Sequence, residues 1–223
     1  MRYEQLRGEV AATARALISS GLVVGTAGNV SARTPEGDVL VTPSGLDYAV
    51  LEPEDVVLVD LEGNPVEGNL EPSSETPMHT GIYRARPEVH GIVHTHAPYA
   101  TTLACMGWEI PPVHYMLAAL SDEGRVPIAD YATYGTEELA RNCAAALGTT
   151  YGACLLRNHG TIAVGDSVEK AYFRTEVLEE MSALYFRTRS LGEPILLSPE
   201  QIGATAEKLA GYGQSKEISP DAV

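Results

Sequence analysis

The stretch Gly91-Ile92-Val93-His94-Thr95-His96 decides the fold, because it joins a buried strand to a pair of histidines. Its apolar residues predict a strand, which follows a helix predicted at 75–86 and ended by Pro87. Alternate residues of a strand project from the same face, with Cα atoms about 6.5–7 Å apart. His94 and His96 can therefore turn toward one point.

Short strands and amphipathic helices are predicted on both sides of this strand. Leu6, Val10, Ala14 and Leu17 recur at spacings of three and four, which indicates a helix over 4–19. The other predicted elements are strands at 29–32, 38–42, 56–60, 153–156 and 161–164, a helix at 136–147, and a long helix from Ser167 to about Leu191.

Several connections between the predicted strands are too short for helical crossovers, which favours antiparallel pairing. The expected fold class is α/β, with one mostly antiparallel sheet layered with helices. We expect residues 1–223 to form a single domain of this kind, with a more polar C-terminal tail from about residue 195.

The composition restricts the class of ligand. A formal net charge of −15, with no basic run, argues against nucleic acid or an anionic membrane as partner. No run of about 18 apolar residues occurs, and the charged first residues lack the apolar core of a signal peptide. The three cysteines are widely separated, as is usual for reduced thiols. We therefore expect a cytoplasmic protein that binds a small molecule.

A third histidine can complete a metal site with the pair on the strand. His159 lies in the predicted turn between two paired strands, and with His94 and His96 it would form a three-histidine site with an open fourth position. Such a site suits Zn²⁺ and is catalytic in type. The alternative is that the pair is only a polar strand face. The histidines interpreted as structural or solvated are His79, His90 and His114.

Three segments are candidates for binding an anion. Ser73 and Ser74 precede a predicted helix, where free N–H groups and the helix dipole favour negative charge. Glu75 would act there as a general base, and the alternative is a simple N-cap. The turns at 26–31 and 42–45 combine hydroxyls with glycine, as a phosphate site requires, although a plain β-turn explains either one alone.

Taken together, these motifs resemble the class II aldolase/adducin family. In chain order they are Gly28-Asn29-Val30-Ser31, Thr42-Pro43-Ser44-Gly45, Pro72-Ser73-Ser74-Glu75, His94-Thr95-His96 and Arg157-Asn158-His159-Gly160. Their order and spacing cover most of the chain. The resemblance implies a three-layer α/β/α sandwich and a homotetramer whose active sites lie at subunit interfaces.

The resemblance also implies roles for individual residues. One Zn²⁺ per subunit would be bound by His94, His96 and His159, with Glu75 approaching the metal. The residues implied to bind the substrate phosphate are Thr26, Gly28, Asn29, Ser44, Gly45, Ser73 and Ser74.

The implied activity is reversible cleavage of a small phosphorylated sugar, a ketose 1-phosphate such as L-fuculose 1-phosphate, to dihydroxyacetone phosphate and an aldehyde. Zn²⁺ would stabilise the enediolate, and Glu75 would move the proton on the dihydroxyacetone phosphate carbon. Tyr115 of a neighbouring subunit would serve the aldehyde oxygen, and Tyr212 would close the site from the tail. A Schiff-base aldolase is poorly supported by the lysines, which are Lys170, Lys208 and Lys216, all in predicted helix or tail positions.

Three alternatives share parts of this pattern. An L-ribulose-5-phosphate 4-epimerase uses the same scaffold but carries Asp after the paired serines, so Glu75 favours the aldolase. A methylthioribulose-1-phosphate dehydratase is a second enzymatic alternative. A non-catalytic interaction module like the adducin head would lack a working metal site, and the joint presence of His94, His96, His159 and Glu75 argues against it.

Overall fold

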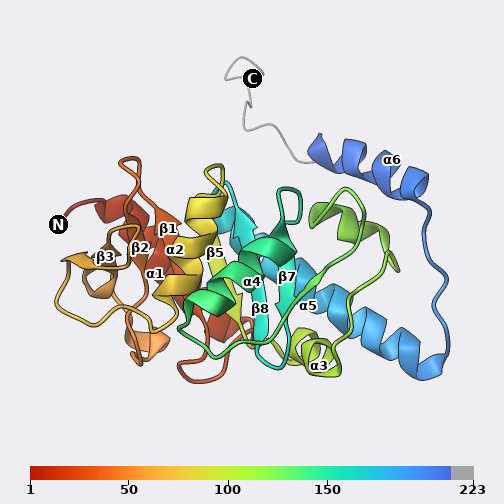
Figure 1. Ribbon diagram of the computed structural model, residues 1–223, viewed down its shortest axis with the longest axis horizontal. Coiled ribbons are helices and arrows are strands. Elements are labelled where there is room, and N and C mark those ends of the chain that lie inside the picture. Colours follow the sequence, from red (N-terminus) through yellow and green to blue (C-terminus); the bar gives the residue numbers. More distant parts are fainter. Residues whose placement is uncertain (212–223) are drawn as a thin grey trace, which may run out of the picture.

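The computed structural model describes residues 1–211, and these form one eight-stranded sheet in the order β4-β3-β2-β1-β5-β8-β7-β6 (Figure 1). The strands are β1 (Asn29–Arg33), β2 (Val39–Val41), β3 (Val57–Val59), β4 (Pro65–Glu67), β5 (Gly91–Thr95), β6 (Ile128–Ala129), β7 (Ala153–Leu156) and β8 (Gly160–Gly165). All neighbours pair antiparallel except β6 and β7, which are parallel. The prediction of a mostly antiparallel sheet is therefore confirmed.

Some of the helices begin at residues whose side chains cap the first turn. Ser167 accepts a hydrogen bond from the backbone N–H of Lys170, and Thr136 accepts one from that of Leu139, so each supplies an acceptor to a free N–H of the first turn. The helices are α1 (Glu4–Ser19), α2 (Thr76–Ala85), α3 (Pro98–Met106), α4 (Glu137–Leu147), α5 (Val168–Leu191) and α6 (Pro199–Ala210). Short 3₁₀ helices are η1 (Tyr48–Val50), η2 (Pro53–Asp55) and η3 (Tyr115–Ala119).

The sheet is covered by helices on both faces, as alternation along β5 shows. Ile92 belongs to the apolar cluster that includes Met78 of α2, and α4 contributes to the same cluster. The next residue, Val93, belongs to the opposite cluster with Leu17 of α1 and Ala171 of α5. Figure 1 shows α2 and α4 in front of the strands and α5 behind them. The three-layer α/β/α sandwich implied by the resemblance is confirmed.

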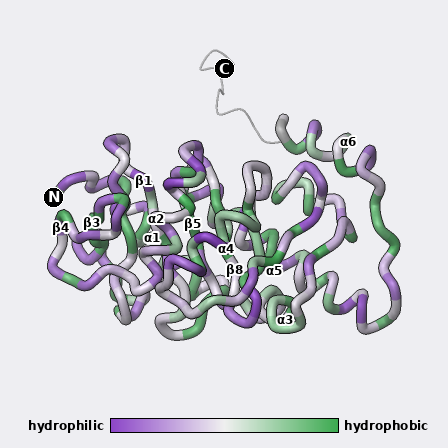
Figure 2. Tube along the Cα trace, in the orientation of Figure 1, coloured by the Kyte–Doolittle hydropathy of each residue, from purple (hydrophilic) through white to green (hydrophobic). Residues whose placement is uncertain are grey.

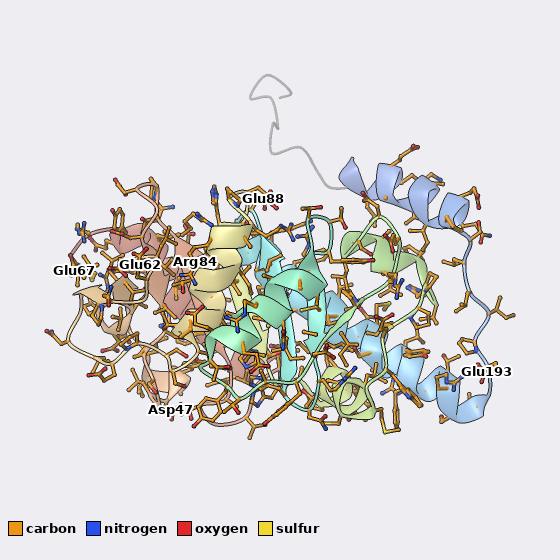
Figure 3. The ribbon with its side chains drawn as sticks, viewed as in Figure 1. Asp47, Glu62, Glu67, Arg84, Glu88 and Glu193 are labelled. Atoms are coloured by element: carbon orange, nitrogen blue, oxygen red, sulfur yellow. The ribbon has the colours of Figure 1, made fainter. Side chains whose placement is uncertain are left out.

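Hydrophobic residues lie mainly inside this sandwich, and charged residues lie mainly on its outside. Figure 2 shows hydrophobic colour along the central strands and hydrophilic colour on outer turns. The acidic residues Asp47, Glu88 and Glu193 lie at the periphery (Figure 3). Within residues 1–211 we find no helix with the length and apolar character needed to cross a membrane.

The pairing of β1 with β5 positions the polar residues of the sheet. Asn29 lies opposite His94, and Ser31 lies opposite Ile92. Directly opposed residues share a face of the sheet, and Ile92 faces α2. Asn29, Ser31 and His94 therefore all point into the layer between the sheet and α2.

Two helices were not predicted from the sequence. One is α3, which has Pro98 in its first turn and ends at Gly107, a residue with a left-handed φ of 67°. The other is α6, which lies within the segment predicted as a tail and is held by the fully buried side chain of Ile202. A Cβ added at Gly124 would lie 2.6 Å from Ile202 Cδ1, so the two residues pack closely.

The close approach of β5 to the start of α5 generates a stability prediction. A Cβ at Gly91 would lie 2.4 Å from the carbonyl oxygen of Ser167, so Gly91→Ala should lower the free energy of unfolding by about 1–3 kcal/mol through overpacking. Gly8→Ala is the matched control, because nothing lies within 4 Å of that Cβ and α1 should gain about 0.5–1 kcal/mol. Urea denaturation measures both, and similar shifts for the two variants would contradict the close packing.

Candidate active site

His94 is placed by the sheet itself. Its side chain is fully buried, and its Nδ1 lies 2.8 Å from the carbonyl oxygen of Thr161 on the adjacent strand β8. A carbonyl oxygen can only accept, so Nδ1 carries the proton and donates. The other ring nitrogen of His94, Nε2, points toward His96 and Glu75.

His96 and His159 complete a triangle of imidazoles with His94. His96 follows the end of β5, and His159 lies in the turn between β7 and β8, next to Asn158, whose φ of 54° is left-handed. The ring centroids lie 4.9 Å, 4.9 Å and 5.1 Å apart, and one potential ligand atom from each ring falls within 4.8 Å of the others. The structure therefore brings together the three histidines singled out in the sequence.

Glu75 lies at the start of α2, with its carboxylate directed at these rings. Its Oε2 is 2.9 Å from Nε2 of His94, and its Oε1 is 3.3 Å from Nε2 of His159. Glu75 is the N-cap residue of α2, yet its side chain caps no backbone group of the helix. The simple N-cap interpretation thus does not account for the carboxylate.

The donor set fits a divalent metal on the geometry of its own atoms. Nε2 of His94 and Nε2 of His96 approach to 3.1 Å, and two such nitrogens need a shared cation or proton between them. Burial, together with the charge of the neighbouring His94, lowers the pKa of His96 to about 4, and burial also lowers the pKa of His159. Neutral imidazoles and a carboxylate are the ligands that metals such as zinc take.

The charge state of Glu75 follows from the same arrangement. Burial alone would raise the pKa of Glu75, but the positive charge of His94, the hydrogen bond to that ring and the charge of His159 lower it overall. Oε1 is buried and has no hydrogen-bond partner within residues 1–211. Glu75 is therefore an ionised carboxylate with one free acceptor beside the imidazoles.

A cavity of about 400 Å³ opens next to this cluster and is lined by Glu75, His96 and His159. All seven residues implied to bind phosphate also line it, namely Thr26, Gly28, Asn29, Ser44, Gly45, Ser73 and Ser74. Backbone hydrogen bonds join the segments that carry them, from Ser73 N–H to the carbonyl of Thr42 and from Ser44 N–H to that of Glu71. Hydroxyls and amides thus face the same space as Glu75, His96 and His159.

The turn at 26–28 reaches the cavity because of a glycine. Gly28 has a left-handed φ of 102°, and a Cβ there would lie 2.7 Å from the carbonyl oxygen of His94. Tyr48 supports the turn from behind, donating its hydroxyl proton to the carbonyl oxygen of Gly28 at 2.6 Å. The backbone of the turn can therefore lie directly against β5.

The tyrosines and lysines differ in whether they line the cavity. Tyr115 is 49% exposed and does not line this cavity, so within residues 1–211 its phenol is not part of the site. Tyr131 and Tyr134 do line the cavity and are exposed. Tyr212 lies outside the described residues. Neither Lys170 nor Lys208 lines the cavity in the part of the chain that the structure describes.

His79, interpreted from the sequence as structural or solvated, lies beside the site. It is fully buried and contacts Asn29, whose amide donates to Glu75 at 3.1 Å. The sequence held a usable signal, because Glu75, His79 and Tyr83 are spaced by four and so share one face of a helix. The contacts of this helix face are made with Asn29 and Ser31 of β1, and these depend on the pairing of β1 with β5.

The fold and the site together match one family. Residues 8–186 match the family model described as Class II Aldolase and Adducin N-terminal domain. This chain belongs to the class II aldolase and adducin family, which confirms the resemblance seen in the sequence.

Similar proteins support the assignment over nearly the whole chain. The 5-deoxy-D-ribulose 1-phosphate aldolase of Bacillus thuringiensis serovar kurstaki is 41% identical, over 96% of this chain and 100% of the relative. The 5-methylthioribulose-1-phosphate/5-deoxyribulose-1-phosphate aldolase of Rhodospirillum rubrum is 41% identical, over 97% of each chain. A solved L-fuculose 1-phosphate aldolase is 37% identical, with a TM-score of 0.89, over 94% of this chain and 98% of that one.

The triangle of imidazoles predicts metal binding that depends on His159. Titration of metal-stripped protein with Co²⁺ should give about one ion per chain with the d–d absorption of a nitrogen and oxygen ligand set. His159→Ala should weaken this binding at least about tenfold, because it removes one ligand from an exposed turn. His90→Ala is the control, since that histidine is exposed and belongs to no described ligand group. Unchanged Co²⁺ affinity in His159→Ala would exclude this site.

Proposed function

We propose that this chain is a zinc-dependent aldolase that cleaves a ketose 1-phosphate to dihydroxyacetone phosphate and a small aldehyde. The observation that carries the proposal is one cavity in which Glu75, His96 and His159 face the hydroxyls and amides of the phosphate-binding candidates. The names of the relatives, aldolases of L-fuculose 1-phosphate and of 5-deoxyribulose 1-phosphate, support the same reaction.

The reaction needs a base, an acid and a place for negative charge. The C4 hydroxyl of the ketose loses its proton, the C3–C4 bond breaks, and its electron pair moves onto the C2 carbonyl oxygen. C4 leaves as an aldehyde, and C3 then takes up one proton to complete dihydroxyacetone phosphate. One proton is lost and one gained, so no oxidant or further reactant is required.

His94, His96 and His159 would hold the metal, with Glu75 as the nearby carboxylate. The metal, when bound, supplies Lewis-acid stabilisation of negative charge on the substrate oxygens. Zinc is the ion that fits three imidazoles in a catalytic site with an open position. The histidines are positioned for this by the end of β5 and by the turn before β8.

Glu75 would move the proton at C3. Its carboxylate is ionised in the free enzyme, and Asn29 holds Oε2 by a hydrogen bond of 3.1 Å. The remaining oxygen, Oε1, is without a hydrogen-bond partner within residues 1–211 and can accept a proton. A general base needs both a free lone pair and a fixed position, and Glu75 has both.

The phosphate would lie against the hydroxyls and backbone amides across the cavity. Ser44 and Ser74 are exposed to it, and Asn29 and Ser73 are buried at its edge. Tyr115 of a neighbouring subunit would contact the aldehyde oxygen in a homotetramer, and Tyr212 would close the site. Because Tyr115 is exposed on its own chain, its phenol is free to serve another.

Tyr131 and Tyr134 indicate the class of sugar. They line the cavity together with Ala132, so one side of it is aromatic and carries no formal charge. Such a wall suits an aldehyde end that bears a methyl group rather than a second phosphate. L-Fuculose 1-phosphate and 5-deoxyribulose 1-phosphate share this feature, and we propose 1-phosphorylated deoxyketoses as the substrate class.

A panel of sugar phosphates tests the proposed reaction. The zinc-loaded enzyme should release dihydroxyacetone phosphate from L-fuculose 1-phosphate or 5-deoxyribulose 1-phosphate, measured by coupled reduction with a dehydrogenase. L-Ribulose 5-phosphate is the comparison, since an epimerase would convert it without releasing dihydroxyacetone phosphate. 5-Methylthioribulose 1-phosphate completes the panel, because a dehydratase would release water from it and leave the carbon chain intact. Absence of dihydroxyacetone phosphate from every ketose 1-phosphate would refute the aldolase assignment.

Glu75→Gln tests the proton transfer separately from metal binding. The variant should keep its zinc but lose at least about 100-fold in the rate of proton exchange at C3 of dihydroxyacetone phosphate, because the amide cannot act as a base. Exchange in D₂O followed by proton NMR measures this rate. Glu138→Gln, an exposed change in the first turn of α4, is the matched control. Normal exchange in Glu75→Gln would remove Glu75 from the reaction.

A further inference from the structure

A chain of hydrogen bonds runs from Glu75 into the layer between the sheet and α2. Asn29 Nδ2 is 3.1 Å from Oε2 of Glu75, and Asn29 Oδ1 contacts Nε2 of His79. His79 Nδ1 is 2.6 Å from the hydroxyl of Ser31, which in turn is 2.9 Å from the hydroxyl of Tyr83. Five residues from β1 and α2 are thus connected without a gap.

The direction of each hydrogen bond follows from one acceptor. Nδ2 of Asn29 donates to the carboxylate oxygen Oε2 of Glu75, so the Oδ1 of the same amide faces His79. An amide oxygen also only accepts, so Nε2 of His79 must carry the proton. In a neutral imidazole the other nitrogen is then an acceptor, and it receives the hydroxyl proton of Ser31.

Burial keeps this pattern in a single state. His79, Ser31 and Tyr83 are fully buried or nearly so, and Asn29 is 4% exposed. Desolvation lowers the pKa of His79 to about 3, so the ring stays neutral throughout the pH range in which the protein would work. No side-chain polar atom of these four residues lacks a partner within residues 1–211.

We propose that His79 is a positioning residue, whose Nε2–H fixes the Asn29 amide with its Nδ2 toward Glu75. Asn29 then holds Oε2 of Glu75, and Oε1, on the side of His159, is the oxygen that takes up and returns the proton. The inference rests on the proposed function of Glu75 as the proton-transfer group. It adds the group that orients Glu75 and the oxygen that reacts.

The variants His79→Leu and His79→Gln test whether His79 orients the Asn29 amide or only fills space in the layer between the sheet and α2. Leucine fills the space but leaves Oδ1 of Asn29 without its donor, so the amide is free to turn. Glutamine can place its side-chain N–H near the position of Nε2 and restore that donor. Ser182→Ala is the matched control, because it also removes a fully buried polar group, one that donates to Leu178 within α5 on the far face of the sheet.

The expected result is a loss of turnover with zinc binding retained. In the zinc-loaded enzyme, His79→Leu should lower kcat about 100-fold, with a zinc content within about threefold of that of the unsubstituted enzyme. His79→Gln should recover at least about tenfold of that loss, and Ser182→Ala should keep full kcat. If His79→Leu keeps its kcat, or if His79→Gln is no better than a folded, zinc-containing His79→Leu, the inference is overturned.

The tautomer of His79 provides a readout that needs no substrate. Full-length protein labelled with ¹⁵N-histidine should show His79 as the Nε2–H tautomer in a long-range ¹H–¹⁵N spectrum, with its signals assigned by their loss in His79→Gln. An Nδ1–H tautomer overturns the inference even if the enzyme cleaves ketose 1-phosphates. The Nε2–H tautomer in a protein that cleaves none of the panel would instead locate the failure in the proposed function.

Discussion

The antiparallel pairing of β1 with β5 is the constraint on which the site depends. It sets Asn29 opposite His94, so an amide and an imidazole from distant parts of the chain share one face of the sheet. A shift of β1 by one residue against β5 would turn Asn29 toward α1 and α5 and away from His94, because side chains alternate between faces. The apolar neighbours Val30 and Val93, buried on the opposite face, make such a shift costly. The hydrophobic core therefore determines which polar atoms meet.

Among the buried polar residues around Glu75, negative charge is carried by the Glu75 carboxylate. Burial lowers the pKa values of His79, His96 and His159, so these rings are neutral at pH 7 and offer lone pairs or single N–H donors. Glu75 is the ionised residue among them, and its pKa is lowered chiefly by the charge of His94 and the hydrogen bond to that ring. A carboxylate beside neutral imidazoles attracts a cation, whereas the cavity wall of hydroxyls and amides suits an anion. A place that favours a cation and a wall that suits an anion thus lie side by side.

Local patterns in the sequence were sufficient for most elements and for the convergence of three histidines. The His-x-His spacing on a strand, with a third histidine in a turn, describes the triangle found at the end of β5. His79 could not be assigned in this way, because its partner Asn29 is 50 positions away and is brought near only by sheet pairing. Helix α6 was missed although Ser198 and Gln201 form a capping box and Pro199 follows the cap. The polar composition of this segment led to the prediction of a tail, although the capping residues indicated the start of a helix.

The polar chain behind Glu75 lies in a layer that is otherwise hydrophobic. Met78, Ile82 and Ile92 fill the space around it, and apolar side chains of similar volume in place of the whole set Asn29, Ser31, His79 and Tyr83 would fill the same layer. Burying a serine, a histidine and a tyrosine there requires every donor to meet an acceptor, which restricts each side chain to one orientation. Stability alone does not explain such an arrangement. At the end of the chain of hydrogen bonds, Asn29 presents its N–H to Oε2 of Glu75, while Oε1 has no hydrogen-bond partner within residues 1–211.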